Sequence, residues 1–169
     1  MASNQDCEAV VDVIRSVFEE YSFTWEAEGY HADLYDLEGH YDGKSAKFFI
    51  AENDGKVVGT VGIEFFPPHP DDPCGLTESE GLRWVSGSDC SLERLYVHPS
   101  GRRLGVGRAL MQHVVDVAKA AGRTQMEIWS DKRFVDAHRL YGQFGAVVVG
   151  DRILDDPDLS PEWGLALKL

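Results

Sequence analysis

The sequence has no long apolar run and few cysteines. Its 169 residues contain nothing close to the roughly 18 uninterrupted apolar residues of a membrane span, and residues 1–6 lack the basic and then apolar order of a signal peptide. We therefore expect a cytoplasmic protein without a membrane segment. Because Cys7, Cys74 and Cys90 lie far apart and form no C-x-x-C pair, we expect free thiols. The histidines have no companion at metal-ligand spacing, so we expect no metal.

Positive charge is also scarce. The net charge of −13 argues against nucleic acid as a partner, because such binding draws most of its affinity from Lys and Arg. Residues 1–90 hold 19 acidic and 5 basic side chains, whereas residues 91–169 hold 10 and 11. Two interpretations stay open: the acidic half is a solubilising surface, or it attracts a cationic ligand while the other half binds an anion.

Apolar periodicity outlines one compact domain over residues 1–169, the usual size for a single core. It predicts helices over 7–21, 32–41, 105–121 and 134–144, and strands over 47–52, 57–66, 92–97, 124–129, 146–150 and 164–168. Asn53-Asp54-Gly55-Lys56 is typical of a hairpin turn between the first two strands. The proline-rich segment 67–73 predicts a long irregular loop that runs to about Cys90. This order of elements indicates a mixed α/β sheet, antiparallel early and with helical crossovers later.

The segment Arg102-Arg103-Leu104-Gly105-Val106-Gly107-Arg108 lies between a predicted strand and a predicted helix. Its two glycines remove side chains where backbone could approach a ligand, and the helix that follows points unpaired N–H groups at the same place. The helix dipole and the arginines both favour an anion there, and a pyrophosphate suits this charge best. A glycine-rich turn with solvated arginines is the alternative.

Two other phosphate motifs fit less well. Residues 42–45 have the G-K-S end of a P-loop, but Glu38 occupies the position of its first glycine, so we interpret this segment as a plain turn. Residues 105–110 begin like a dinucleotide fingerprint, and Glu127 lies at a suitable distance to hold a ribose. The third glycine is missing, and Gly105 lies eight residues past Val97. A dinucleotide-binding oxidoreductase domain therefore remains only an alternative.

Three segments together carry a family resemblance: Leu92-Glu93-Arg94-Leu95-Tyr96-Val97-His98-Pro99, then Arg102-x-x-Gly105-x-Gly107, then Ala137-His138-Arg139-Leu140-Tyr141-Gly142-Gln143-Phe144-Gly145-Ala146. In this order, and over about residues 47–151, the chain resembles the GNAT superfamily of acyl-CoA-dependent N-acetyltransferases. The resemblance implies a mixed, mostly antiparallel central sheet with helices on both faces. It also implies that the strand over 92–97 splays from the strand over 124–129, and it makes a homodimer a fair expectation.

The resemblance names acetyl-CoA as the co-substrate. It implies that the backbone at residues 95–97 bonds the pantetheine arm, with the acyl carbonyl against the Val97 amide, and that amides from Arg103 to Arg108 hold the pyrophosphate. Phe134 stands where the family often has an asparagine that bonds the pantetheine. The residues expected against the cofactor are Leu95, Tyr96, Val97, Arg102, Arg103, Leu104, Gly105, Val106, Gly107, Arg108, Phe134, Ala137 and Tyr141.

Two side chains are expected to act on protons. Tyr141 matches the family tyrosine near the cofactor sulfur, where a phenol could protonate the departing thiolate; a core aromatic is the alternative. The acceptor amine must be neutral before it attacks, so a carboxylate is needed near the acyl group. Glu93, on the strand that leads into the cofactor contact, is the first candidate, with an ordinary surface glutamate as the alternative. Glu64 and Glu127 are the reserves.

These expectations combine into one function. The chain is expected to move an acetyl group from acetyl-CoA to a primary amine by direct attack in a ternary complex, and the acceptor is expected to be a cationic small molecule or peptide. A non-catalytic acyl-CoA-binding module is the second alternative, beside the dinucleotide domain. The acceptor, the acyl chain length and the oligomeric state stay open, because residues 23–41 and 67–90 contain no transferable motif.

Overall fold

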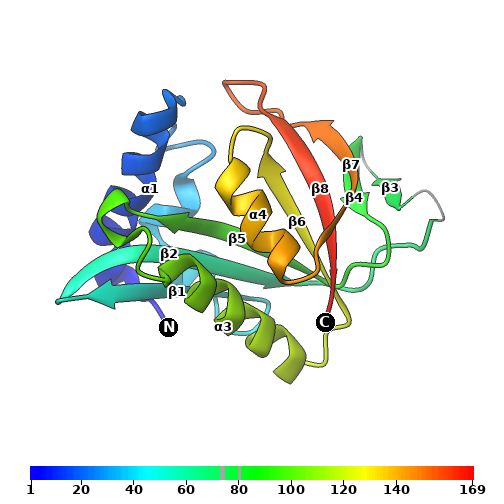
Figure 1. The fold of residues 1–169 in the computed structure, drawn as a ribbon, viewed down its shortest axis with the longest axis horizontal. Helices are drawn as coiled ribbons and strands as arrows, with labels where there is room; N and C mark the ends of the chain where they lie inside the picture. The colour runs from blue at the N-terminus through cyan, green and yellow to red at the C-terminus, as the bar shows by residue number, and fades with distance from the viewer. Residues whose placement is uncertain (73–74, 80) are drawn as a thin grey trace. The chain divides into compact units, whose positions relative to one another are not determined.

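The computed structural model describes residues 1–72, 75–79 and 81–169 (Figure 1). The helices are α1 Cys7–Tyr21, α2 Leu37–His40, α3 Val106–Ala120 and α4 Val135–Gln143, with short 3-10 helices η1 Asn4–Asp6, η2 Ala32–Tyr35 and η3 Pro99–Gly101. The strands are β1 Ala46–Asn53, β2 Lys56–Phe65, β3 Leu76–Ser79, β4 Leu82–Val85, β5 Cys90–Val97, β6 Gln125–Asp131, β7 Val147–Ile153 and β8 Pro161–Lys168. Within the described ranges, no helix has both the length and the apolar character needed to cross a bilayer. Cys74, one of the expected free thiols, lies outside the described residues.

The described chain forms two compact units, each built from two separate segments. The first consists of Met1–Glu64 and Glu93–Val114, and the second of Phe65–Leu92 and Val115–Leu169. Strands follow the order β1-β2-β5 in the first unit and β5-β6-β8-β7 in the second, because β5 contributes its first three residues to the second unit. The β5–β6 pair is parallel, whereas the pairs β1–β2, β6–β8 and β7–β8 are antiparallel. The expectation of a mixed, mostly antiparallel α/β fold is confirmed; the single domain stays a prediction.

Helices cover both faces of the sheet in the first unit. Along β1, alternate side chains point to opposite faces. Phe48 belongs to the buried cluster that α1 supplies with Val10, Val11, Ile14 and Phe18. Its neighbour Phe49 points the other way and meets the ring of His113 on α3, with ring centroids 4.4 Å apart. The apolar side chains of α1 therefore pack on one face of the sheet, and α3 contacts the other face.

In the second unit, the last strand of the chain is a central one. Strand β8 lies between β6 and β7 and bonds to both, as Figure 1 shows. Helix α4 is attached to β6 through His138, whose Nε2 lies 3.1 Å from the hydroxyl of Ser130. A separate hairpin, β3–β4, belongs to the same unit.

Two sequence-based expectations were wrong. The helix expected over residues 32–41 is divided into η2 and α2, because Asp36 leaves helical geometry and its side chain accepts a hydrogen bond from the Gly39 amide, starting a new turn. The segment expected as an irregular loop up to Cys90 contains the hairpin β3–β4. Its strands have four residues each, too short for a clear alternation of apolar and polar side chains.

Candidate functional site

The loop that connects β5 to α3 forms an open helix start. Arg103 and Gly105 both have left-handed backbone conformations, with φ of 62° and 81°. The Ala109 amide bonds the Gly105 carbonyl at 2.9 Å, so the Val106 and Gly107 amides precede the first helical bond. A Cβ atom placed on Gly105 would have no heavy atom within 4 Å. Because the amides are reachable and the helix dipole is positive at this end, the position can bind an anion.

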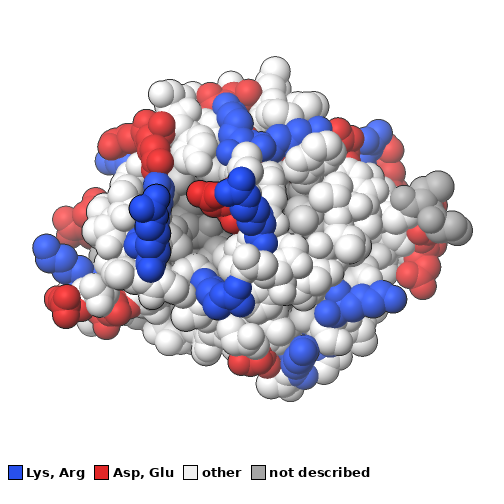
Figure 2. Space-filling view, in the orientation of Figure 1, with Lys and Arg blue, Asp and Glu red and all other residues white. Residues whose placement is uncertain are grey.

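The three arginines of this segment lie in different surroundings. The guanidinium of Arg102 forms an ion pair with Glu20 at the end of α1, and its Nε lies 3.4 Å from the Val97 carbonyl oxygen. The hydrogen bond from Arg102 lowers the pKa of the Glu20 carboxyl. Arg103 and Arg108 are exposed. Figure 2 shows basic side chains over the start of α3 and acidic ones over the end of α1. Arg103 and Arg108 thus place positive charge at the exposed surface near the open amides.

Strand β5 is paired differently along its two edges. Its pairing with β6 covers only Cys90, Ser91 and Leu92, and no ladder continues on that edge over 93–97 within the described part of the chain. The other edge follows β2, and just past the strand the His98 amide donates to the Val58 carbonyl at 3.0 Å. The backbone at residues 95–97, which was expected to bond a pantetheine arm, therefore belongs to a strand whose second edge is not paired along its later half.

A backbone irregularity interrupts β5 at Arg94. This residue has a φ of 50°, which is left-handed and uncommon for a residue other than glycine. Its carbonyl accepts a hydrogen bond from the hydroxyl of the buried Thr60 at 2.8 Å. In a regular strand Glu93 and Arg94 would point to opposite faces, but here both line the same cavity.

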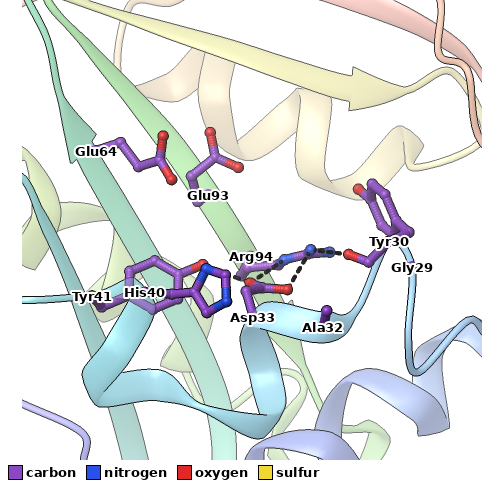
Figure 3. Close-up of a pocket in the computed structure, with 9 residues that line it drawn as sticks. All are labelled: Gly29, Tyr30, Ala32, Asp33, His40, Tyr41, Glu64, Glu93 and Arg94. Atoms are coloured by element: carbon purple, nitrogen blue, oxygen red, sulfur yellow. Dashed lines mark hydrogen bonds and ion pairs between the residues drawn. The ribbon is translucent and has the colours of Figure 1, made fainter.

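That cavity lies in the first unit and has a volume of about 250 Å³ (Figure 3). It is lined by residues of β2, β5 and the segment 29–41: Gly29, Tyr30, Ala32, Asp33, His40, Tyr41, Glu64, Glu93 and Arg94. Arg94 closes one side of it. Its Nε and Nη2 donate to the two oxygens of Asp33 at 3.1 and 2.8 Å, and its guanidinium lies over the Tyr30 ring. The hydroxyl of Tyr41 donates to the same carboxylate at 2.8 Å. Asp33 therefore links the segment 29–41 to β5 through Arg94.

Two expected carboxylates, Glu64 and Glu93, meet in this cavity, and Figure 3 shows them on the same side of it. The absence of a side chain at Gly62 leaves room for Glu93, because a Cβ there would lie 3.0 Å from the Cβ of Glu93. Burial and, second, the charge of Asp33 raise the pKa of Glu64, whose side chain nevertheless keeps an exposed part. The described His, Cys, Asp and Glu residues form no group of three suited to a metal ion, and the absence of a metal stays a prediction.

The third carboxylate candidate, Glu127, lies in the second unit and is not part of the cavity lining. It is 1% exposed and accepts a hydrogen bond from the Val85 amide at 2.8 Å, which joins β4 to β6. Burial raises its pKa to about 7. A structural role as the link to the hairpin accounts for these contacts.

Tyr141 also belongs to the second unit, on α4, where it is 4% exposed. Burial raises the pKa of its hydroxyl, and a hydrogen bond with Ser130 acts in the opposite direction. Phe134 precedes the first residue of α4 as its N-cap, and Ala137 lies in the first turn. All three expected contacts thus lie on one helix.

Sequence reasoning missed the cavity wall. Asp33, His40 and Tyr41 lie in a segment without a recognisable motif, and Arg94 was quoted only as part of a strand. The ion pair between Asp33 and Arg94 joins residues 61 positions apart. The only available signal was the excess of acidic side chains in the N-terminal half, which does not indicate where they gather.

Three comparisons with known proteins agree with one another: a family model matches most of the chain, curated relatives match part of it, and solved structures share its fold. The model of the acetyltransferase (GNAT) family matches residues 11–146. N-acetyltransferase 8 of Rattus norvegicus is 28% identical over 126 residues, which cover 74% of this chain and 50% of that protein. The chain therefore spans about half the length of this curated relative.

Two solved structures illustrate the likeness of the fold. An acetyltransferase from Streptococcus agalactiae matches with a TM-score of 0.75 and 16% identity, covering 100% of this chain and 94% of that one. The PaiA N-acetyltransferase from Thermoplasma acidophilum, in complex with coenzyme A, matches with a TM-score of 0.64 and 14% identity, covering 99% and 96%. Because the family model spans most of the sequence and the solved structures share its fold, the chain belongs to the acetyltransferase (GNAT) family.

Proposed function

We propose that the chain transfers an acetyl group from acetyl-CoA to a primary amine that binds in the cavity of the first unit. One observation carries the proposal: strand β5 places Glu93 in an acidic cavity and then leads directly into the open, arginine-flanked start of α3. A site for an amine and a site for a pyrophosphate are thus joined by one strand. The coenzyme A in the Thermoplasma relative and the names of the curated relatives support the choice of co-substrate.

The residues at the helix start fit the charged part of acetyl-CoA. The amides of Val106 and Gly107, together with the side chains of Arg103 and Arg108, would hold the pyrophosphate, and the backbone at 95–97 would bond the pantetheine arm. Arg102 would act indirectly, because its guanidinium is engaged by Glu20. Acetyl-CoA supplies the acetyl group as a thioester.

Two side chains of the protein would carry out the proton transfers of the reaction. A primary amine is mostly protonated at neutral pH, so it must lose a proton before it can attack a carbonyl carbon. Glu93 would accept that proton, directly or through water. Tyr141 would donate a proton to the departing thiolate, and because burial raises its pKa it keeps that proton at neutral pH. No covalent enzyme intermediate is needed, so transfer would occur in a ternary complex.

The test is to incubate the protein with acetyl-CoA and pools of primary amines, following thiol release and the acetyl mass shift of the products. We expect acetyl-CoA to raise the Tm, nicotinamide dinucleotides to leave it unchanged, and thiol release to require an amine. Glu93→Gln should lower kcat by roughly 100- to 10,000-fold, the usual contribution of general base catalysis. Glu52→Gln, at an exposed glutamate of β1, is the matched control.

Two outcomes would contradict the proposal. If acetyl-CoA raises the Tm but no amine causes thiol release, the chain is a binding module. If a nicotinamide dinucleotide stabilises the protein and acetyl-CoA does not, the dinucleotide alternative replaces the acetyltransferase.

A further inference from the structure

The chemistry of the cavity narrows the class of acceptor, on the condition that the proposed function holds. Its volume of about 250 Å³ is below the roughly 300–1,000 Å³ of pockets for drug-sized ligands, so a compact molecule fits best. Three carboxylates line it, from Asp33, Glu64 and Glu93, against one permanent cation, Arg94. The lining is therefore anionic, and His40 is the only other member that can carry a positive charge.

The single permanent cation is already engaged. Arg94 makes two charge-assisted hydrogen bonds to Asp33, and a third from Nη2 to the Tyr30 carbonyl at 2.5 Å. The two side chains of the ion pair are only 10% and 15% exposed. A largely buried bidentate pair of this kind is costly to open, because separating it would leave two desolvated charges. Arg94 thus neutralises Asp33 through Nε and Nη2. Its Nη1 has no hydrogen-bond partner among the described residues but is buried, so it is poorly placed to bind an acceptor carboxylate.

Glu64 differs from Asp33 in having no such partner. Its carboxylate makes no hydrogen bond and no ion pair with any residue among 1–72, 75–79 and 81–169. Although Glu64 keeps an exposed part, partial burial and the charge of Asp33 raise the pKa of its carboxyl, and the charges of Arg94 and His40 offset this only in part. A cation bound beside Glu64 would relieve that cost.

The two glutamates lie close enough together for one short ligand to contact both. Gly62 faces Glu93 across the β2–β5 pair, and Glu64 lies two residues further along β2, on the same face. Such diagonal neighbours have Cα atoms about 7–8 Å apart, a distance that long side chains and a short ligand can bridge. Figure 3 shows both carboxylates directed into the same part of the cavity.

We propose that the acceptor is a compact aliphatic diamine, whose first amino group reacts beside Glu93 while the second stays protonated and binds Glu64. In the reaction, the first ammonium gives its proton to Glu93, and the neutral nitrogen forms a C–N bond with the acetyl carbon. The C–S bond of the thioester breaks, and the thiolate takes a proton from Tyr141. The attacking nitrogen gives up its second proton to water as the amide forms, and a proton from water restores Tyr141, so the products are an amide, a free thiol and a protonated Glu93 that loses its proton to solvent. The second ammonium keeps its charge throughout, so Glu64 remains paired in substrate and product.

The test compares three acceptors of equal carbon chain: diaminobutane, butylamine and γ-aminobutyric acid. We expect kcat/KM for diaminobutane to exceed that for butylamine by about 10-fold or more, which corresponds to about 1.4 kcal/mol. γ-Aminobutyric acid should be worse than butylamine, because its carboxylate meets Glu64. In Glu64→Gln the diaminobutane-to-butylamine ratio should fall toward one, whereas the exposed Glu52→Gln control should retain it.

The outcomes separate the two proposals. Equal kcat/KM for diaminobutane and butylamine, or an unchanged ratio in a folded Glu64→Gln protein, would overturn the diamine assignment while transfer itself is preserved. Preference for γ-aminobutyric acid would overturn it in favour of an amino acid acceptor bound through Arg94. If acetyl-CoA binds and none of a broad pool of amines is acetylated, the proposed function fails and the diamine assignment fails with it.

Discussion

At the scale of single residues, one backbone angle at Arg94 determines which side chains line the cavity. With regular strand geometry, the side chains of Glu93 and Arg94 would lie on opposite faces of β5. The left-handed angle at Arg94 directs both into one cavity, and the hydroxyl of Thr60 bonds the carbonyl that this turn exposes. A strained residue of this kind costs on the order of 1–3 kcal/mol, which the bonds of Arg94 to Asp33 and Tyr30 help to offset.

Tyr141→Phe tests whether the buried hydroxyl takes part in catalysis. The substitution keeps the ring, so packing, Tm and most of the affinity for acetyl-CoA should be preserved. Without the proton for the thiolate, kcat should fall by roughly 100- to 10,000-fold with little change in cofactor affinity. Steady-state kinetics where chemistry limits the rate would measure this. An undiminished kcat in the folded variant would leave Tyr141 as a core aromatic, for which Tyr141→Ala should cost about 3–5 kcal/mol of stability.

Glu127 should make stability depend on pH. Its pKa is about 7 in the folded chain and 4.5 when unperturbed, so the folded state holds the proton more tightly. The stabilisation is therefore complete below about pH 4.5 and is lost as pH rises through about 7, by roughly 3 kcal/mol in total. Urea unfolding at several pH values should show this decline in the wild type and its absence in Glu127→Gln, whose amide can still accept from Val85. Parallel pH profiles for the two proteins would show that Glu127 is not the group responsible.

At the scale of elements, β5 and the helix after it connect two chemical environments. The strand carries Glu93 in the cavity, and the loop after it ends in the open amides of α3. A displacement of β5 would therefore disturb both the proposed acceptor site and the proposed cofactor site. A change in the cavity lining should affect only the acceptor, and a change at the start of α3 should affect only the cofactor.

Gly105→Asp tests the flank that would bind the cofactor. A carboxylate at the helix start would repel the pyrophosphate, so we expect the Kd for acetyl-CoA, measured by calorimetry, to rise by about 100-fold or more, or about 2.7 kcal/mol. Gly55→Asp is a matched control, since Gly55 also has a left-handed φ, 72° against 81°, and open space around it. Unchanged affinity in a folded Gly105→Asp protein would remove the basis for the cofactor assignment.

Elements with a long and regular pattern could be predicted from the sequence, and short ones could not. The helix over 7–21 was predicted with the bounds of α1, because its apolar stripe extends over four turns. The strands β3 and β4 were missed because each is held by its partner strand and, for Val85, by Glu127, rather than by a pattern of its own. The division of residues 32–41 depended on one capping bond of Asp36, which periodicity does not detect.

For the whole molecule, the unequal charge of the two sequence halves remains informative. The first half contributes Asp33 and Glu64 to the cavity, and the second half contributes the arginines of the helix start. The cavity lining could not be predicted, because it depends on the ion pair between Asp33 and Arg94. The order of residues in the sequence gives no sign of such a contact. The glycine-rich segment and Glu93 could be found because local spacing carries their signal.

The acidic excess predicts a dependence on ionic strength. If acidic side chains attract a cationic acceptor, kcat/KM for that acceptor should fall as salt rises, because charges are screened over about 10 Å at 0.1 M. The kcat at saturating acceptor should change much less. Measuring kcat/KM across a salt series, with a neutral acceptor analogue as reference, would check this. Equal sensitivity of both acceptors would indicate that the charge serves solubility instead.

The position of β8 sets an order in which the second unit can assemble. Among the described strands, β7 has β8 as its only neighbour, although β7 precedes β8 in the chain. Strand β7 therefore has no strand to pair with until β8 has been synthesised, and it joins the sheet only through β8, which pairs with β6. Until then its exposed side chains at Val147, Val148 and Ile153 leave an apolar strand unpaired, which is the period of greatest risk for misassociation during folding.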